Sequence, residues 1–227
     1  MSHLWGSRAA LFAGDHLFGC AAALVAETRN IRVIRLMAQT LDLICRGEMQ
    51  QAVEDRRWPQ SRQAYFLRIQ GKTALLFATA AESGAILGGA SEQVIEALRE
   101  YGLNLGMAFQ IVDDVLDFIG EEEELGKPRG SDLRQGAVTL PMICFLESHG
   151  EDVQGNLLRG ILMGTGEGKE LLLALEMVGT SPAIGQACAV AQEFVTQAQE
   201  ALWSIPEGSY RQAMLELADY YAFRRHR

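Results

Sequence analysis

Apolar residues with helical spacing dominate this sequence, and the alternation typical of strands persists nowhere along it. Between residues 31 and 53 they recur every three or four positions, at Ile34, Met37, Leu41, Ile44, Cys45 and Met49. This spacing places them on one face of an amphipathic helix. The pattern predicts an all-α fold, and because repeats and low-complexity linkers are absent, we expect one domain over residues 1–227.

Two stretches in the middle of the chain extend the helical pattern. Residues around Tyr65 lead into the nearly uncharged run 72–89, which predicts a buried helix that ends at a Gly-Gly pair. A long helix is predicted over residues 92–119. Its glycines Gly102 and Gly106 lie about one turn apart, where a neighbouring helix can approach closely.

The second half of the chain predicts shorter helices after a charged, glycine-rich loop at residues 120–136. We expect these helices at residues 138–147, 154–163, 169–178, 182–203 and 209–221. Ser181 before Pro182 is typical of a helix cap and first position. Ser209 with Gln212 fits a capping box.

The charge balance and the cysteines indicate a cytoplasmic setting. With 20 Lys and Arg against 29 Asp and Glu, the net charge is −9, which argues against nucleic acid as a partner. We find neither a secretory signal pattern nor an uninterrupted apolar run long enough to span a bilayer, so we expect no stable membrane insertion. The cysteines predict reduced, mostly buried thiols; they are Cys20, Cys45, Cys144 and Cys188.

The pattern Asp113-Asp114-x-x-Asp117 is the feature best suited to chemistry, and it contains the only Asp-Asp pair of the sequence. Because each helical residue advances by about 100°, the three side chains lie within about 60° of Gln110 and share its face. Apolar residues flank this face on both sides, so we expect it to line an internal cavity. Crowded carboxylates become favourable when a multivalent cation bridges them, and oxygen ligands favour Mg²⁺.

Two other interpretations of these aspartates stay open at this point. They could form a solvated charge cluster on the surface of a helix. They could also pair with arginine or lysine side chains of a facing helix, in which case their role would be structural.

Several segments resemble the trans-isoprenyl diphosphate synthases, also called polyprenyl synthetases. Residues 109–117, Phe-Gln-Ile-Val-Asp-Asp-Val-Leu-Asp, are similar to the second aspartate-rich motif of that family. Residues 125–133 and 136–141 match the segments that come after the motif in the family, and residues 13–18, 47–51 and 71–74 stand upstream in the family's order. The resemblance covers nearly the whole chain and implies an all-α helical bundle of the isoprenoid-synthase type around a central cavity.

The resemblance implies a prenyltransferase that elongates an allylic diphosphate with isopentenyl diphosphate and uses Mg²⁺ as cofactor. In such a reaction the C–O bond of the allylic diphosphate breaks, isopentenyl diphosphate attacks the resulting cation, and a proton is lost. Metal ions and cationic side chains stabilise the leaving diphosphate. Apolar helices shield the carbocation from water.

The resemblance also assigns roles by position. Asp113 would bind Mg²⁺ directly, and Asp114 and Asp117 would hold metal directly or through waters. Lys72 and Lys127 would bind the allylic diphosphate. Facing the cation and the leaving group would be Thr73 and Gln110. Taken on their residues alone, the two lysines could instead be a helix-end cation and a solvated loop lysine. Supporting hydrogen bonds are expected at Asp15, Glu48, Gln51 and Asp132, and the arginines of residues 224–227 would bind isopentenyl diphosphate or form an exposed basic end.

The sequence differs from the family pattern in one respect. The family has a first Asp-Asp-x-x-Asp motif upstream of the second, with basic segments around it, and this sequence contains neither the first motif nor those segments. We therefore expect an N-terminally truncated form of the fold, with little chain elongation by the chain alone. Apolar faces left exposed would be covered in a homodimer or in a heterodimer with another synthase subunit. The alternative function is a non-catalytic or regulatory subunit of a heteromeric prenyl diphosphate synthase, and a class I terpene cyclase is a third hypothesis.

Overall fold

The computed structural model describes residues 2–54, 61–120, 128–164 and 168–223, and within these ranges it contains helices and no strand. In chain order the elements are α1 (Ser2–Glu27), α2 (Ile31–Glu54), α3 (Arg62–Ile69), the π-helix η1 (Gln70–Ala74), α4 (Leu75–Leu87), α5 (Glu92–Ile119), α7 (Ser131–Gln135), α8 (Leu140–His149), α9 (Val153–Leu162), α10 (Lys169–Gly179), α11 (Pro182–Ala201), the 3₁₀-helix η2 (Leu202–Ser204) and α12 (Ser209–Phe223). The prediction of an all-α fold is confirmed.

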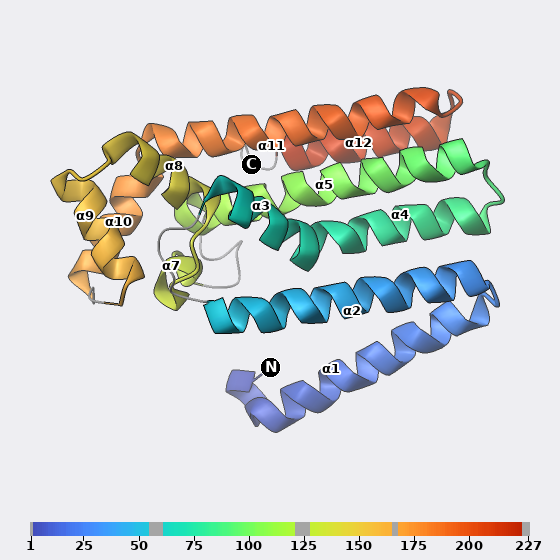
Figure 1. Cartoon of the computed structure of the whole chain (residues 1–227), viewed down its shortest axis with the longest axis horizontal. Coiled ribbons are helices and arrows are strands. Elements are labelled where there is room, and N and C mark those ends of the chain that lie inside the picture. The colour runs from blue at the N-terminus through green and yellow to red at the C-terminus, as the bar shows by residue number, and fades with distance from the viewer. Residues whose placement is uncertain (1, 55–60, 121–127, 165–167, 224–227) are drawn as a thin grey trace.

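The long helix α5 is the centre of the bundle. It packs against α4 on one side and α11 on the other, with α12 beside α11 and α2 outside α4 (Figure 1). The shorter helices α7–α10 gather at the end of α5 that carries the aspartates. The bounds predicted for α5 are confirmed, and those for α2 agree to within one residue.

The glycine pair of α5 brings α4 close, as the sequence predicts. A Cβ placed on Gly102 would lie 2.5 Å from the backbone oxygen of Phe77. One placed on Gly106 would lie 2.6 Å from the Cα of Ala74. Real Cβ atoms do not approach backbone atoms so closely, so the contact between these helices depends on the missing side chains.

Four local predictions are wrong. The loop predicted at residues 120–136 contains the short helix α7, between Gly130 and Gly136, which both adopt left-handed backbone conformations. The run 72–89 is only partly buried, and it begins with a π-helix rather than an α-helix. The expected capping box does not form, because the Gln212 side chain donates to Glu216 in the following turn. Of the four free cysteines, Cys20 and Cys45 are exposed rather than buried.

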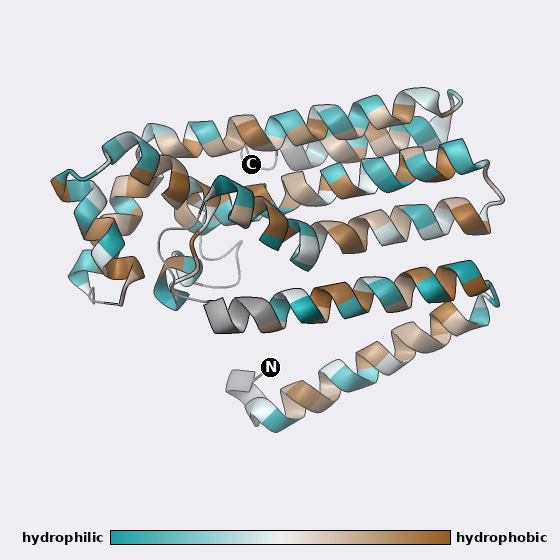
Figure 2. Cartoon of the chain, in the orientation of Figure 1, coloured by the Kyte–Doolittle hydropathy of each residue, from teal (hydrophilic) through white to brown (hydrophobic). Residues whose placement is uncertain are grey.

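The first helix, α1, lies at the edge of the bundle beside α2 and carries many apolar residues (Figure 2). Large apolar side chains between 55% and 68% exposed are Leu11, Phe12, Leu17, Phe18 and Leu24. Residues 6–27 are also long and apolar enough to span a membrane by length and composition, whereas the sequence predicted no run of that kind. Between α1, α2 and α4 lies an apolar cavity of about 270 Å³.

Candidate functional site

The acidic face predicted on α5 is withdrawn from solvent. The side chains of Asp114 and Asp117 are buried, at 4% and 0% exposure, and those of Asp113 and Gln110 are half-buried. A solvated charge cluster is therefore not what these residues form. Their contacts inside the protein determine which of them can meet a ligand.

A chain of hydrogen bonds runs across this face and joins three helical segments. The Thr73 hydroxyl, from η1, donates to Gln110 Oε1 at 2.7 Å. Gln110 Nε2 in turn donates to Asp114 Oδ1 at 2.9 Å. From α3, the Tyr65 hydroxyl donates to Asp114 Oδ2 at 2.7 Å. Both oxygens of Asp114 thus accept hydrogen bonds from neutral side chains. These contacts differ from the pairing with arginine or lysine that the sequence analysis left open as an alternative.

The π-helix η1 positions two of the predicted site residues. Its wider turn follows α3 without a break and includes Gly71, a weak helix former. π-helical turns of this kind occur often at functional sites. Thr73 faces Gln110 from this turn, whereas Lys72 is about half-exposed and forms an ion pair with Glu48 of α2, with Nζ and Oε1 3.2 Å apart.

Asp117 holds the chain that returns after α5. Its Oδ2 accepts a hydrogen bond from the backbone N–H of Asp132 at 3.1 Å. Its backbone oxygen accepts one from the N–H of Gly130 at 2.9 Å. Gly130 has a φ of +70°, and a Cβ there would collide with the methyl carbons of Leu175. Glycine is therefore required where the chain turns into α7.

Of the three aspartates of α5, Asp113 is the one whose carboxylate is suited to bind Mg²⁺ directly. Among the described residues, no three Asp, Glu, His or Cys side chains gather in a group that could hold a metal ion. Asp114 and Asp117 accept hydrogen bonds inside the protein, whereas Asp113 is half-buried and has no hydrogen bond or ion pair within the described part of the chain. Mg²⁺ commonly takes one or two carboxylates and completes its shell with phosphate oxygens and water. Asp113 suits that arrangement.

Burial changes the protonation of the network. It raises the pKa of Asp114 to about 7, although the hydrogen bonds from Tyr65 and Gln110 act in the opposite direction. The neighbouring carboxylate of Asp132 raises this pKa further, and the guanidinium of Arg68 lowers it. Burial, together with the charge of Asp114, also raises the pKa of Tyr65 well above its usual value. Tyr65 therefore remains a hydroxyl donor at neutral pH.

Asp114 should make the stability of the metal-free protein depend on pH. In the unfolded chain this carboxyl titrates near pH 4, at about 3.9, whereas in the folded protein its pKa is about 7. The folded state binds more protons between these values, so the free energy of unfolding falls as the pH rises from about 4 to 7. In Asp114→Asn this contribution disappears, and thermal melts in EDTA between pH 5 and 8 should show a weaker decline than the wild type.

The matched control for this experiment is Asp42→Asn. Asp42 is exposed and pairs with Arg46 on α2, an interaction worth about 1 kcal/mol or less. This variant should follow the pH profile of the wild type. Parallel profiles for the wild type and Asp114→Asn would contradict the assignment of the pH dependence to Asp114.

The remaining predicted residues are only partly within the structure. Lys127, the Gln51 side chain and the arginines of residues 224–227 lie outside the described residues. Asp15 is exposed on α1, and Asp132 supports Asp117 through its backbone. Sequence reasoning missed Tyr65, which it named only within the stretch that leads into the uncharged run, and Arg68, whose guanidinium lies 5.4 Å from the centre of the Tyr65 ring. The available signal was a tyrosine, with its polar hydroxyl, in the helical stretch that leads into a nearly uncharged run.

Comparison with known protein sequences places residues 1–175 in a match to the polyprenyl synthetase family model. The chain is 37% identical over 227 residues to a short chain isoprenyl diphosphate synthase of Methanothermobacter thermautotrophicus, and it covers 69% of that protein. It is 35% identical over 219 residues to heptaprenyl diphosphate synthase component 2 of Geobacillus stearothermophilus. These 219 residues are 95% of this chain and 66% of the relative, so the chain spans about two thirds of the length of these relatives.

Comparison with solved structures agrees. The fold superposes with a TM-score of 0.93 on a polyprenyl synthase from Caulobacter crescentus in complex with calcium and isoprenyl diphosphate. The two share 34% sequence identity, over 99% of this chain and 68% of the other.

Proposed function

This chain belongs to the polyprenyl synthetase family, and we propose on that basis that it takes part in prenyl chain elongation, joining an allylic diphosphate to isopentenyl diphosphate with Mg²⁺. The observation that carries the proposal is the withdrawn polar face of α5. On this face the half-buried Asp113 lies beside the chain of hydrogen bonds from Asp114 through Gln110 to Thr73, and Thr73 is the neighbour of Lys72. Carboxylate, amide, hydroxyl and ammonium groups together suit a metal-bound diphosphate.

The residues of the chain divide the work. Asp113 would hold Mg²⁺ directly, while Asp114 and Asp117 would act through waters, because both already accept hydrogen bonds in the protein. When bound, the metal supplies positive charge that stabilises the departing diphosphate. Lys72 would exchange its exposed partner Glu48 for diphosphate oxygens, joined by Lys127. Thr73 and Gln110 would present oriented dipoles towards the reacting carbon and the leaving group.

We place the chain in a heteromeric or homodimeric enzyme. One relative is named component 2 of a heptaprenyl diphosphate synthase, a name that implies a second component in that protein. The exposed apolar face of α1 is suited to cover by another subunit. A non-catalytic or regulatory subunit of such an assembly is the second candidate function, favoured by the same name.

Two measurements test the proposal. Titration calorimetry should show that the purified chain binds inorganic pyrophosphate only with Mg²⁺ present. Incubation with radiolabelled isopentenyl diphosphate, farnesyl diphosphate and Mg²⁺ should give little longer product from the chain alone and more once a partner subunit is added. Binding without turnover in any assembly would favour the regulatory role. If pyrophosphate does not bind at all, the proposal is wrong.

The apolar face of α1 predicts self-association that one charge should weaken. Leu17 is 68% exposed on this face. We expect Leu17→Glu to raise the dissociation constant of the assembly at least about tenfold, because it removes a leucine that the assembly would bury and adds a charge. Sedimentation velocity at micromolar concentration measures this constant.

Leu172→Glu is the matched control, since Leu172 is 59% exposed but lies on α10. It should sediment as the wild type does. A wild-type chain that is monomeric at micromolar concentration would contradict the role of α1 in self-association.

A further inference from the structure

We propose that Tyr65 is a positioning residue for the diphosphate site, acting through Asp114 to orient the metal-binding face of α5. The inference rests on the proposed function and extends it to a residue outside the aspartate motif. Tyr65 precedes Lys72 by seven positions and belongs to α3, a different helix from the carboxylate it holds.

The contact between Tyr65 and Asp114 is enclosed. The Tyr65 side chain is fully buried, and its hydroxyl lies 2.7 Å from Asp114 Oδ2. Gln110 occupies the other oxygen of the same carboxylate at 2.9 Å. With both oxygens bound, Asp114 cannot rotate about its terminal bond without losing two hydrogen bonds. A hydrogen bond to a charged group is among the stronger ones in a protein.

The ring of Tyr65 is itself fixed in place. The ring of Phe66 meets it edge-on, with centroids 5.6 Å apart, and Arg68 lies over its face while donating to the backbone oxygen of Val138. With the ring held by these contacts, the hydroxyl stays within hydrogen-bond distance of Asp114 Oδ2.

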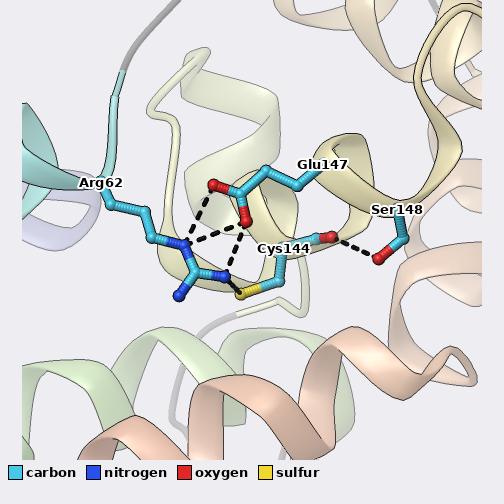
Figure 3. Close-up of polar contacts among 4 residues, drawn as sticks. All are labelled: Arg62, Cys144, Glu147 and Ser148. Atoms are coloured by element: carbon cyan, nitrogen blue, oxygen red, sulfur yellow. Dashed lines mark hydrogen bonds and ion pairs between the residues drawn. The ribbon is translucent and has the colours of Figure 1, made fainter.

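The start of α3 is anchored to α8 by a second set of contacts (Figure 3). Arg62 Nε lies 3.0 Å from both carboxylate oxygens of Glu147, and Arg62 Nη2 lies 2.6 Å from Oε2 and 3.5 Å from Cys144 Sγ. This pair ties the first residue of α3 to α8, about one turn before Tyr65.

The position of Asp114 affects Asp113 and Gln110, the residues of α5 proposed to contact the metal and the substrate. Asp113 precedes Asp114 on the same turn of α5, and Gln110, one turn earlier, is oriented by its bonds to Asp114 and Thr73. If Asp114 could rotate, Gln110 would lose the acceptor that orients its amide. The chain of hydrogen bonds from Asp114 through Gln110 to Thr73 would then no longer be held at Asp114. Tyr65 therefore affects substrate binding indirectly, through its hydrogen bond to the Asp114 carboxylate.

The test compares Tyr65→Phe with Tyr101→Phe. Tyr101 is also buried on the bundle interior, and its hydroxyl donates to the backbone oxygen of Met214 at 2.9 Å, towards the other end of α5. Each substitution removes one hydroxyl and keeps the ring. We expect Tyr65→Phe to weaken Mg²⁺-dependent binding of inorganic pyrophosphate about tenfold, measured by titration calorimetry on protein shown to be folded by circular dichroism. Tyr101→Phe should bind as the wild type does.

A double-mutant cycle separates positioning from a general loss of stability. If Tyr65 acts through Asp114, then Tyr65→Phe added to Asp114→Leu, which offers the hydroxyl no hydrogen-bond partner, should cause no further loss of pyrophosphate affinity. This comparison remains informative even if the single Tyr65→Phe variant is unfolded, because the double variant buries no charge. A further loss in the double variant would overturn the inference.

The outcomes distinguish the inference from the proposed function. Normal wild-type binding together with unchanged affinity in folded Tyr65→Phe overturns the role of Tyr65 and leaves the proposed function standing. An equal loss in Tyr65→Phe and Tyr101→Phe also overturns it, since both would then act through stability. Failure of the wild type to bind pyrophosphate with Mg²⁺ overturns the proposed function and the inference with it.

Discussion

Replacement of Gly106 by alanine is expected to destabilise the fold by about 1–3 kcal/mol, the usual cost of overpacking a tight interface. The new Cβ would lie 2.6 Å from the Cα of Ala74, and backbone atoms cannot swing aside as a flexible side chain does. The helices must therefore separate. Because Thr73 precedes Ala74, separation also lengthens the 2.7 Å hydrogen bond between Thr73 and Gln110. Urea unfolding and pyrophosphate binding should both report the change.

Gly84→Ala supplies the matched control for this prediction. Gly84 lies inside α4 with nothing within 4 Å of the position of a Cβ. Alanine there should stabilise the protein by about 0.5–1 kcal/mol, because glycine is the weaker helix former. Equal stability of the Gly106→Ala and Gly84→Ala variants would contradict the close approach of α4 to α5.

Asp113→Asn is expected to have the largest effect on ligand binding. If Asp113 is the direct protein ligand of Mg²⁺, removal of its charge should weaken Mg²⁺-dependent pyrophosphate binding about 100-fold or more, since a metal ligand contributes several kcal/mol. Its half-buried side chain has no protein partner in the described part of the chain, so thermal stability should change by no more than about 0.5 kcal/mol. Titration calorimetry and thermal melts check the two parts separately.

The control for Asp113 is again Asp42→Asn, the same chemical change at an exposed position on α2. It should bind Mg²⁺ and pyrophosphate with the affinity of the wild type. Wild-type affinity in Asp113→Asn would show that the metal ligands lie elsewhere, and a large loss of stability would show a structural role.

The strongest periodic patterns predicted the structure well. The bounds of α5 and the close approach at its two glycines followed from local rules, because a long amphipathic stripe and a missing Cβ act whatever surrounds them. The five residues of α7 are too few to form a stripe, so the same rules treated them as loop. The prediction of a capping box was wrong because of one side chain, that of Gln212, which donates a hydrogen bond to Glu216 instead.

Residues that meet only in the folded state lay beyond prediction. Tyr65 and Asp114 are 49 positions apart in the sequence, and no local pattern joins them. The π-helical turn that carries Thr73 packs against α5, and no local sequence pattern predicts a turn of this rare type. The sequence predicted exposed apolar faces but not that α1 carries one of them, since an apolar helix has the same sequence whether neighbours cover it or not.

The two bonds that Asp117 makes to the returning chain respond differently to a substitution at this position. The N–H of Gly120 bonds to Leu116 and that of Gly130 to Asp117, so the chain leaves α5 and comes back at the same turn of the helix. The bond from Gly130 goes to the backbone oxygen of Asp117 and the bond from Asp132 to its side chain. A substitution of the Asp117 side chain therefore removes only the second bond, and the return of the chain at Gly130 keeps its backbone anchor.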